Sequence, residues 1–579
     1  MHTGNWWWEM QEVFEKHHPN ATIVPIITSS DKTQVTLFRN KTAYPVYMTI
    51  GNLPKFIRQK PTRYAQILIA YLPTTKLTHI KVKASRRRVL ANLFHTCMSF
   101  VLDPLIPAGD KGMRLVSGDG AVHHGFPLHA IFVGDYPEQL LVTGRKNGEC
   151  PVGDVKRDEL GDFNMQCIPW DIVPIRHALA SIDKGYDAFY KACSSVGIKP
   201  IQNIFWRHHP YTNIHMCITP DVLHQLFQGV IKHVFSWLKL VFGHDEIDAR
   251  CRRFPPNHKI RLFLNGITHL SRITGTEYAQ LCQLILGIII DMRLPNGLSS
   301  DRLIRSVRAI LDFLYLAQYP VHSDKTLDSL EDALCRFHNN KDIFIDLNIR
   351  EHFNIPKLHY CQHFRMFIEH IGTTDNCSTE YTERLHIDMA KDAYAATNRK
   401  DEYPQMTLWL ERKEKVVHHD RYIQRRLTSK NIPSTFELNT MRHPPVLVPH
   451  RELLMSKHPS VNRVLFGTLI DDYGAKDFEY CLGEYIAKAQ APEQVFTTTT
   501  LRIATRSVLT FVPFHAVAVY HCIKFTEHDP YSITKGPESI VDAIQAEPGR
   551  KDKYGQPIPG RFDTALINVD GGVTSGVKG

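Results

Sequence analysis

The sequence contains no Cys-x-x-Cys pair, although 12 cysteines are scattered along its 579 residues. At this low density a disulfide framework is not expected, and reduced thiols are typical of a cytosolic or nuclear protein. The lack of paired cysteines also excludes a zinc finger built from cysteines alone.

The sequence also lacks an apolar run long enough to span a bilayer. The most apolar stretch, residues 281–292 (LCQLILGIIIDM), is too short and predicts a buried helix. The N-terminal segment, MHTGNWWWEMQEVFEKHHPN, has no basic region followed by an apolar one, so it does not resemble a secretory signal. We therefore expect a soluble protein without a membrane partner.

Two common catalytic motifs are missing as well. No Gly-x-Gly-x-x-Gly or P-loop sequence is present, so nucleotide cofactors are unsupported. No Gly-x-Ser-x-Gly sequence is present, so a serine hydrolase is unsupported. What remains is ordinary globular composition, with 43% hydrophobic and 22% charged residues and a net charge of +10. Two to four domains are expected, and the basic balance is compatible with a polyanionic partner.

The N-terminal part reads as a mixed α/β region. A short helix in residues 1–20 precedes β-branched runs, and residues 21–150 are expected to form one half of a domain. Pro25 lies inside the first run and favours an edge position or a bulge for that strand. Strands are predicted at residues 21–28, 35–38, 42–53, 113–117 and 126–133, and helices at 58–72 and 85–105.

The rest of the chain changes character twice. Residues 151–350 are predicted to be a polar linker or small insert, up to about residue 197, followed by a large helical insertion, and 351–427 to complete the domain. Thr219-Pro220-Asp221 is a helix start, with Thr219 expected at the cap. A smaller, mixed or β-rich region is expected at 428–545 and a disordered tail at 546–579.

Three acidic residues stand out by their positions. Asp31 and Asp135 each follow a strand-like run, and Glu383 lies in a later helical, charge-rich stretch. Two aspartates at strand ends and one glutamate from a helix are what a two-metal phosphoryl-transfer site needs, because Mg²⁺ prefers carboxylate oxygens. Asp119 competes with Asp135, and Glu380 with Glu383. The plainer interpretation, that these acids cap turns or cover an exposed helix, stays open.

Histidines offer two further candidates. Asp221 and His224 form an Asp-x-x-His pair at the start of a helix and can share a hydrogen bond. His359 and His363, in His-Tyr-Cys-x-His, could bind zinc, but the motif lacks a second half. The sequence therefore gives only weak support for zinc.

Basic residues near the acidic stretch are candidates for contacts with DNA phosphates. Such side chains can neutralise phosphates, although each alone more often belongs to a solvated helix face. The candidates are Arg384, Lys391, Arg399, Arg412 and Lys413.

Several long segments resemble one known family. The segments ATIVPIITSSDKTQVTLF, AYPVYMTIGNL, GDYPEQLLVTG, TPDVLHQLFQGVIKH and TERLHIDMAKDAYAATNRKDEYPQM are similar to the Plavaka transposases. These belong to the Kyakuja–Dileera–Zisupton superfamily of cut-and-paste DNA transposases. The resemblance covers roughly residues 6–427.

The resemblance implies an RNase H-like core, interrupted by a large all-α insertion and followed by a smaller C-terminal region. It implies a DDE triad of Asp31, Asp135 and Glu383 that holds two Mg²⁺ or Mn²⁺ ions, with Asp221 and His224 as the Asp-x-x-His signature. Double-stranded DNA is the implied partner, at transposon ends and target. A nuclear location and a homo-oligomeric active form are implied too.

Two departures from the family pattern lead to an alternative. A Cys-x₄-Cys-Pro-x-Cys segment is expected after the YPEQ motif, but here only Cys150 is present, with Arg145 and Gly153 at the other positions. The chain also starts almost at the first strand, which suggests N-terminal truncation. The alternative function is therefore a catalytically inactive, truncated DNA-binding protein or relic of a transposon.

Overall fold

The computed structural model describes most of the chain and divides it into two compact units. The described residues are 1–36, 41–117, 120–164, 168–255, 257, 260–261, 263–271, 273–428, 452–456, 458–491, 494, 496–510, 512–528, 539–551 and 555–562. The first unit comprises Met1–Ile247 and Thr268–Lys430, and the second comprises Asp248–Ile267 and Asn431–Gly579.

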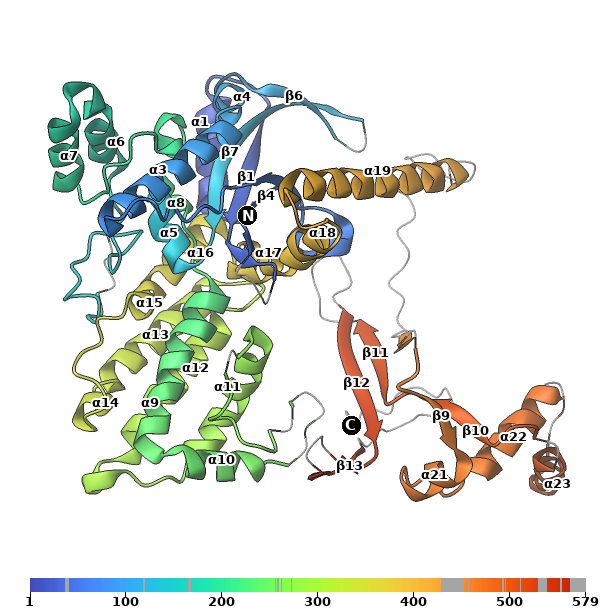
Figure 1. Cartoon of the computed structure of the whole chain (residues 1–579). Helices are drawn as coiled ribbons and strands as arrows, with labels where there is room; N and C mark the ends of the chain where they lie inside the picture. The colour runs from blue at the N-terminus through green and yellow to red at the C-terminus, as the bar shows by residue number, and fades with distance from the viewer. Residues whose placement is uncertain are drawn as a thin grey trace. The chain divides into compact units, whose positions relative to one another are not determined.

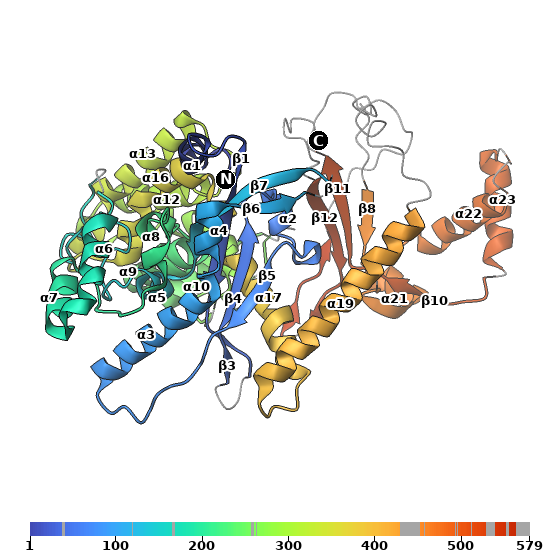
Figure 2. The same ribbon diagram turned by 90° about the horizontal axis from the view of Figure 1, so that it is seen from above.

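A mixed five-stranded sheet forms the centre of the first unit (Figures 1 and 2). Its spatial order is β5-β4-β1-β7-β6. β4 is antiparallel to both β1 and β5, β7 runs parallel to β1, and β6 is antiparallel to β7. The strands are β1 (Ala21–Ser30), β4 (Pro45–Ile50), β5 (Ile67–Tyr71), β6 (Met113–Val116) and β7 (Val122–Val133), and a separate two-stranded ribbon pairs β2 (Thr33–Gln34) with β3 (Thr42–Ala43).

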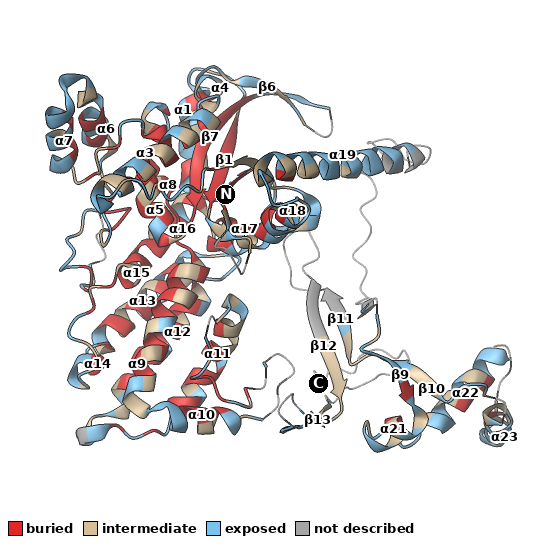
Figure 3. Cartoon of the chain, in the orientation of Figure 1, coloured by how far each residue is buried: buried red, intermediate tan, exposed pale blue. Residues whose placement is uncertain are grey.

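Strand β1 is central and almost wholly buried, as its run of β-branched residues predicts (Figure 3). The expected edge position for the strand that contains Pro25 is therefore wrong, but the expected irregularity is present. The register of β1 against β7 shifts between Ile26 and Ile27, because β7 carries an extra residue, Ala130, at that point. The carbonyl of Pro25 still accepts a hydrogen bond from the backbone nitrogen of Gly51, at 2.8 Å.

Two predicted elements of the sheet region differ from the structure. The strand predicted at residues 35–38 is absent at residues 35 and 36, and residues 37 and 38 lie outside the described part. The helix predicted at 58–72 is wrong for its second half, because Ile67–Tyr71 forms β5. β5 lies at the edge of the sheet beside β4 and is half-exposed. Its short apolar run does not alternate between apolar and polar residues, so its sequence does not distinguish a strand from a helix.

Helices make up the rest of the first unit. Helices α9 and α11–α15 gather in one group beside the sheet (Figure 1). The α-helices are α1 (Asn5–Glu15), α2 (Lys55–Arg58), α3 (Lys83–Leu102), α4 (Leu105–Lys111), α5 (Tyr136–Val142), α6 (Ile172–Ala180), α7 (Tyr186–Ser195), α8 (Ile214–Cys217), α9 (Lys232–Phe242), α10 (His244–Arg252), α11 (Gly275–Ile289), α12 (Ser300–Leu316), α13 (Asp324–Asn340), α14 (Ile343–Asp346), α15 (Pro356–His359), α16 (Phe364–Ile371), α17 (Thr379–His386), α18 (Asp392–Ala395) and α19 (Glu402–Thr428).

Shorter and wider turns connect these helices. Two segments are π-helices, η4 (Val222–Ile231) and η8 (Ile387–Lys391). The 3₁₀ turns are η1 (Pro61–Arg63), η2 (Ser181–Lys184), η3 (Phe205–His208), η5 (Pro295–Gly297), η6 (Tyr360–His363) and η7 (Thr374–Asn376). The π-helices are notable because such segments are rare and are often found at functional sites.

Residues 172–195 do not form the polar linker that their composition predicted. They fold into α6 and α7, whose buried Ile175, Leu179, Phe189 and Cys193 belong to the same hydrophobic core as β1 and β7. The helix–helix packing here uses only one apolar stripe on each helix, so the exposed faces account for the polar composition.

The second unit is mixed, as its sequence predicts. A four-stranded sheet has the order β15-β12-β11-β8, and β9 pairs with β10 and β13 with β14. The predicted disordered tail from residue 546 is structured at residues 546–551 and 555–562, which contain strands, and its other residues lie outside the described part. The elements are β8 (Glu452–Met455), β9 (Val461–Leu465), α21 (Phe466–Asp471), α22 (Phe478–Gln490), α23 (Thr498–Leu509), β10 (Ala516–Val519), β11 (Cys522–His528), β12 (Ser539–Glu547), β13 (Arg550–Lys551), β14 (Pro557–Ile558) and β15 (Arg561–Phe562).

Two further sequence expectations concern thiols and membranes. All cysteines that the structure describes are free thiols. Within the described ranges, no single helix is long and apolar enough to cross a membrane, although α3 and α4 together reach that length and composition with a 46° bend between them. One face of α3 packs into the core of the first unit through Phe94, Met98 and Leu102.

Candidate active site

Asp31 and Asp135 lie at the same edge of the sheet because of the pairing of β1 with β7. The two strands are parallel neighbours, with Ser29 opposite Val133. Parallel strands present their carboxyl ends at a common edge. Asp31 follows the last residue of β1 directly, and Asp135 follows β7 after one glycine. The structure therefore places both predicted aspartates next to each other in the fold.

Asp135 is held in place by a helix cap. Its backbone is extended, and its Oδ1 accepts a hydrogen bond from the backbone nitrogen of Glu138, at 2.9 Å, at the start of α5. Pro137 occupies the first turn of that helix, where its missing N–H costs nothing. The GDYPEQ sequence thus orients the Asp135 carboxylate and leaves its second oxygen for other contacts.

A third segment brings Asp221 and His224 to the same edge. Ile218 forms an isolated parallel bridge with Phe132 of β7, so the Thr219-Pro220-Asp221 segment ends beside Asp135 in the sheet. The predicted helix start is correct in place, but its cap is Asp221 instead of Thr219. The carboxylate of Asp221 accepts hydrogen bonds from the backbone nitrogen and from Nδ1 of His224, both at 2.8 Å.

Asp221 also fixes the helix that carries Glu383. Its carboxylate accepts hydrogen bonds from the backbone nitrogen of Thr379, at 3.2 Å, and from the Thr379 hydroxyl, at 2.9 Å. Thr379 is the first residue of α17, so this buried carboxylate holds the N-terminus of the helix, where negative charge is favoured. One turn further, Oε1 of Glu383 lies 2.9 Å from Nε2 of His224. His224 therefore links Asp221 and Glu383 through its two ring nitrogens.

The electrostatics show that the three predicted carboxylates are neighbours. Burial, followed by the negative charges of Asp135 and Glu383, raises the pKa of Asp31 to about 6, while His224 opposes the rise. Like charges act on one another in this way when they share a site. The structure thus brings Asp31, Asp135 and Glu383 together, and their roles in catalysis stay a prediction.

His224 is the cation of this cluster. Burial disfavours its charged form, but the hydrogen bonds to Asp221 and Glu383 and the charges of both carboxylates outweigh burial and raise the pKa to about 10. At neutral pH the ring is therefore an imidazolium that partly neutralises the acidic groups. The buried His386 lies on the other side of Asp31, with its Nδ1 4.0 Å from Oδ2 of Asp31, and burial lowers its pKa to about 4.

Sequence reasoning missed a fourth acid, Glu138, which lies directly under the cluster. It is buried and accepts hydrogen bonds from the hydroxyls of Ser30 and Tyr44. Burial is the main cause that raises the pKa of Glu138 to about 8; hydrogen bonds from the two hydroxyls oppose the rise, and the charges of Asp135 and Asp31 contribute to it. The signal was present in the sequence, because a glutamate three residues after Asp135 shares a helix face with the cap.

Two alternatives from the sequence can be placed or set aside. Glu380 is exposed at the first turn of α17, where its backbone nitrogen donates to the hydroxyl of Ser378, the N-cap. It lies one turn from Glu383, and His224 binds Glu383. Asp119, the alternative to Asp135, lies outside the described residues.

The predicted DNA-contact residues are exposed on the segments that follow Glu383. Arg384 pairs with Asp388 at 3.1 Å, and Lys391 lies on η8. Arg399, in the loop before α19, has a left-handed backbone with φ of 64°. Arg412 and Lys413 are exposed on α19, where the Lys413 ammonium lies 5.0 Å from the Trp409 ring centroid. These residues follow one another along the chain away from the cluster.

Comparison with known proteins supports the resemblance drawn from the motifs. No curated protein matches the chain. A family model described as Plavaka transposase matches residues 1–238, which include β1, β7, Asp31, Asp135 and the Asp221–His224 pair. This stretch of the chain is therefore similar to the Plavaka transposases.

Proposed function

We propose that the chain is a DNA transposase of the DDE type, which cleaves and joins DNA strands by Mg²⁺-dependent phosphoryl transfer. The observation that supports this most is the convergence of Asp31, Asp135 and Glu383, which come from two parallel strand ends and one helix. β4 is antiparallel to β1, β5 is antiparallel to β4 and β7 is parallel to β1, which is the arrangement expected for the first four strands of an RNase H-like core.

The donor set of the cluster fits magnesium or manganese. All three side chains offer carboxylate oxygens, the ligands that these hard ions prefer. One oxygen each of Asp135 and Glu383 accepts a hydrogen bond, from Glu138 and His224 respectively, which orients the second oxygen. Asp31 and Glu383 keep 40% and 39% of their side-chain surface exposed, so ions and a DNA phosphate can reach them.

A pair of ions held by these carboxylates would supply Lewis-acid stabilisation of the attacking and leaving oxygens. The protein's own groups would position the reactants around it. His224 holds Glu383, and Asp221 holds both His224 and the start of α17. The raised pKa of Asp31 reflects the crowding of negative charge that bound cations would relieve.

We propose double-stranded DNA as the partner, bound through phosphate contacts on the segments that follow Glu383. Arg384, Lys391 and Arg399 lie closest to the cluster in the sequence, and Arg412 and Lys413 extend the basic surface along α19. Such contacts position a duplex without reading its sequence. A nuclear location and a homo-oligomeric active form complete the proposal, because a transposase acts on chromosomal DNA and joins two transposon ends.

The test is cleavage of DNA that carries the terminal repeats of an element encoding this chain. The wild-type protein is expected to nick or join this DNA with Mg²⁺ or Mn²⁺. Asp31→Asn is expected to lower the rate by on the order of 10³-fold or more, because it removes a charged ligand of the ion pair. Asp392→Asn, an exposed carboxylate on α18, serves as the matched control and should keep the wild-type rate.

Two results would overturn the catalytic proposal. One is cleavage that survives Asp31→Asn. The other is a folded wild-type protein that binds the repeats but does not cleave them with either ion, which would favour the inactive DNA-binding alternative.

A further inference from the structure

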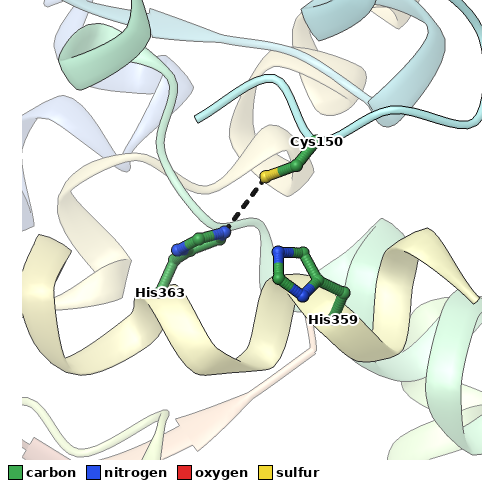
Figure 4. Close-up of side chains that lie close together, drawn as sticks. All are labelled: Cys150, His359 and His363. Atoms are coloured by element: carbon green, nitrogen blue, oxygen red, sulfur yellow. Dashed lines mark hydrogen bonds between the residues drawn. The ribbon is translucent and has the colours of Figure 1, made fainter. Parts of the chain in front are cut away.

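A second polar cluster lies in the first unit, apart from the carboxylates. It contains Cys150, from the loop that follows α5, His359, the last residue of α15, and His363, the last residue of η6. One possible ligand atom from each residue lies within 4.8 Å of the other two. Figure 4 shows the thiol and a nitrogen of each ring turned toward a common point. All three side chains are buried.

The helical geometry explains how the two histidines meet. They are four residues apart on the continuous run of α15, η6 and α16, so they share one face. Their ring centroids are 5.1 Å apart with the planes at 84°. Histidines at this spacing on a helix are a common way to bind zinc.

The position of Cys150 is fixed separately. Its carbonyl accepts a hydrogen bond from Nε1 of Trp170, at 3.1 Å, and its sulfur accepts one from the backbone nitrogen of Gly153, at 3.3 Å. The sulfur then lies 3.1 Å from Nε2 of His363, a residue 213 positions away in the chain. The second half that the His-Tyr-Cys-x-His motif lacked thus comes from the loop that follows α5.

Burial of this cluster without a ligand costs free energy, because it leaves a polar atom without a hydrogen bond. Nε2 of His359 is buried and has no hydrogen-bond partner among the described residues. A buried polar atom of this kind usually has a partner, and those without one call for an explanation such as a bound ion. Nδ1 of the same ring lies 3.4 Å from the amide nitrogen of Gln362, which is a long contact.

Binding of a metal changes the protonation of these groups. Neutral imidazole is the form in which histidine binds metals, and the Cys150 thiol would release its proton to the solvent when the metal binds.

We propose that Cys150, His359 and His363 form a structural binding site for Zn²⁺, with a water molecule as the fourth ligand. A sulfur and two imidazoles suit zinc and do not suit magnesium. With Zn–S of about 2.3 Å and Zn–N of about 2.0–2.1 Å, tetrahedral ligand atoms lie roughly 3.3–3.6 Å apart. The Cys150 sulfur and Nε2 of His363 are 3.1 Å apart, and the three ligand atoms lie within 4.8 Å of one another, so small side-chain shifts would complete the site. The ion would tie the loop after α5 to the helix that leads toward α17.

The site is independent of the proposed phosphoryl transfer, because it shares no residue with the carboxylate cluster. The decisive probe is Co²⁺, which replaces zinc and is coloured. The full-length wild-type protein, stripped of metal and titrated with Co²⁺, is expected to bind one ion with the visible bands of tetrahedral cobalt. It should also show a thiolate-to-cobalt charge-transfer band in the near ultraviolet.

Variants separate the ligands from their neighbours. Cys150→Ser is expected to remove the charge-transfer band and weaken Co²⁺ binding by at least about 100-fold. His359→Gln should weaken binding while the thiolate band persists at high Co²⁺. Cys361→Ala is the matched control. Cys361 lies between the two histidines in the sequence and is buried, but its thiol donates to the carbonyl of Lys357. That variant should bind Co²⁺ like the wild type.

Several outcomes would overturn the proposal. A folded wild-type protein that shows no thiolate–cobalt band would do so even if Cys150→Ser failed to fold. A band that survives Cys150→Ser, or one lost in Cys361→Ala, would also do so. Asp31→Asn should leave the band unchanged, so failure of this site can be told apart from failure of the carboxylate site.

Discussion

The two polar clusters of the first unit are built from neighbouring stretches of chain but have opposite characters. The carboxylate cluster combines residues that follow β1 and β7 with one from α17, and Asp31 keeps 40% of its side-chain surface exposed. The thiol–imidazole cluster combines the loop after α5 with α15 and η6, and Cys150 is 2% exposed. Open oxygen ligands suit exchange of ions and substrate, whereas a closed sulfur–nitrogen set suits an ion that holds the fold together.

The electrostatic states of the two clusters also differ. At the carboxylate cluster, burial and like charges raise the pKa of Asp31, and the cationic His224 supplies only part of the missing positive charge. At the thiol–imidazole cluster, burial keeps every group neutral. The first cluster is thus short of cations, and the second is short of a ligand for its polar atoms.

The largest expected effect separates Glu383 from its neighbour Glu380. Glu383→Gln should lower Mg²⁺-dependent DNA cleavage by on the order of 10³-fold, equivalent to about 4 kcal/mol of transition-state stabilisation, because it removes a charge that the ions need. Glu380→Gln, one turn away and exposed, should stay within about threefold of the wild type. Initial cleavage rates at saturating DNA measure both, and equal losses in the two variants would contradict the assignment.

The next largest effect is the loss of stability that we expect when zinc is removed. Removal of Zn²⁺ with a chelator should lower the free energy of unfolding by about 3–4 kcal/mol, the value expected when a ligand is withdrawn from 100–1,000 times its dissociation constant. Omission of Mg²⁺ should instead lower the stability of wild type and Cys150→Ser by the same amount, because the carboxylate cluster is intact in both proteins. Calorimetry of wild type and Cys150→Ser decides this, and the variant should not respond to the chelator.

A smaller effect is expected at His224, which positions Glu383 without holding an ion. His224→Gln should lower the cleavage rate by about 10–100-fold, the usual cost of losing a group that orients a metal ligand. His418→Gln, on the exposed face of α19, is the control and should keep full activity. A merely structural role predicts that the loss disappears at low temperature, whereas a positioning role predicts a weaker apparent Mg²⁺ affinity at every temperature.

The sequence was sufficient for the parts of the fold and of the candidate site that depend on local pattern. Residues 21–28 and 126–133 are apolar runs that favour buried strands, and both lie in buried strands of the sheet. Asp31 and Asp135 could be placed at the ends of these strands from the sequence. By contrast, residues 67–71 are a half-exposed strand that pairs with β4, and nothing local separates that run from a helix. The pairing with β4 makes this segment a strand, and a single sequence does not show which segments pair.

The same limit applies to the sites. The Asp221–His224 contact could be predicted from helical spacing, but the second bond of His224, to Glu383, joins elements far apart in sequence. Glu138 was overlooked because an acid in the first turn of a helix is ordinary, and only its burial under Asp31 makes it notable. Cys150 and His363 are 213 residues apart, and only the packed core brings them together.

The smallest expected effect is a pH dependence that comes from His224. Its pKa is raised in the folded chain to about 10, above the ordinary 6.5, so its contribution to stability is fully present below pH 6.5 and is lost as the pH rises through about 10. Without added magnesium, wild type should exceed His224→Gln in unfolding free energy by about 1–2 kcal/mol at pH 6.5, and this difference should shrink toward pH 10. Denaturant unfolding of both proteins measures this difference. The contributions of thiols and lysines to the pH dependence cancel, because these groups titrate in both proteins. A gap that widens with pH would mean that His224 is neutral in the folded chain, and Glu383 would then have no cationic partner at the site.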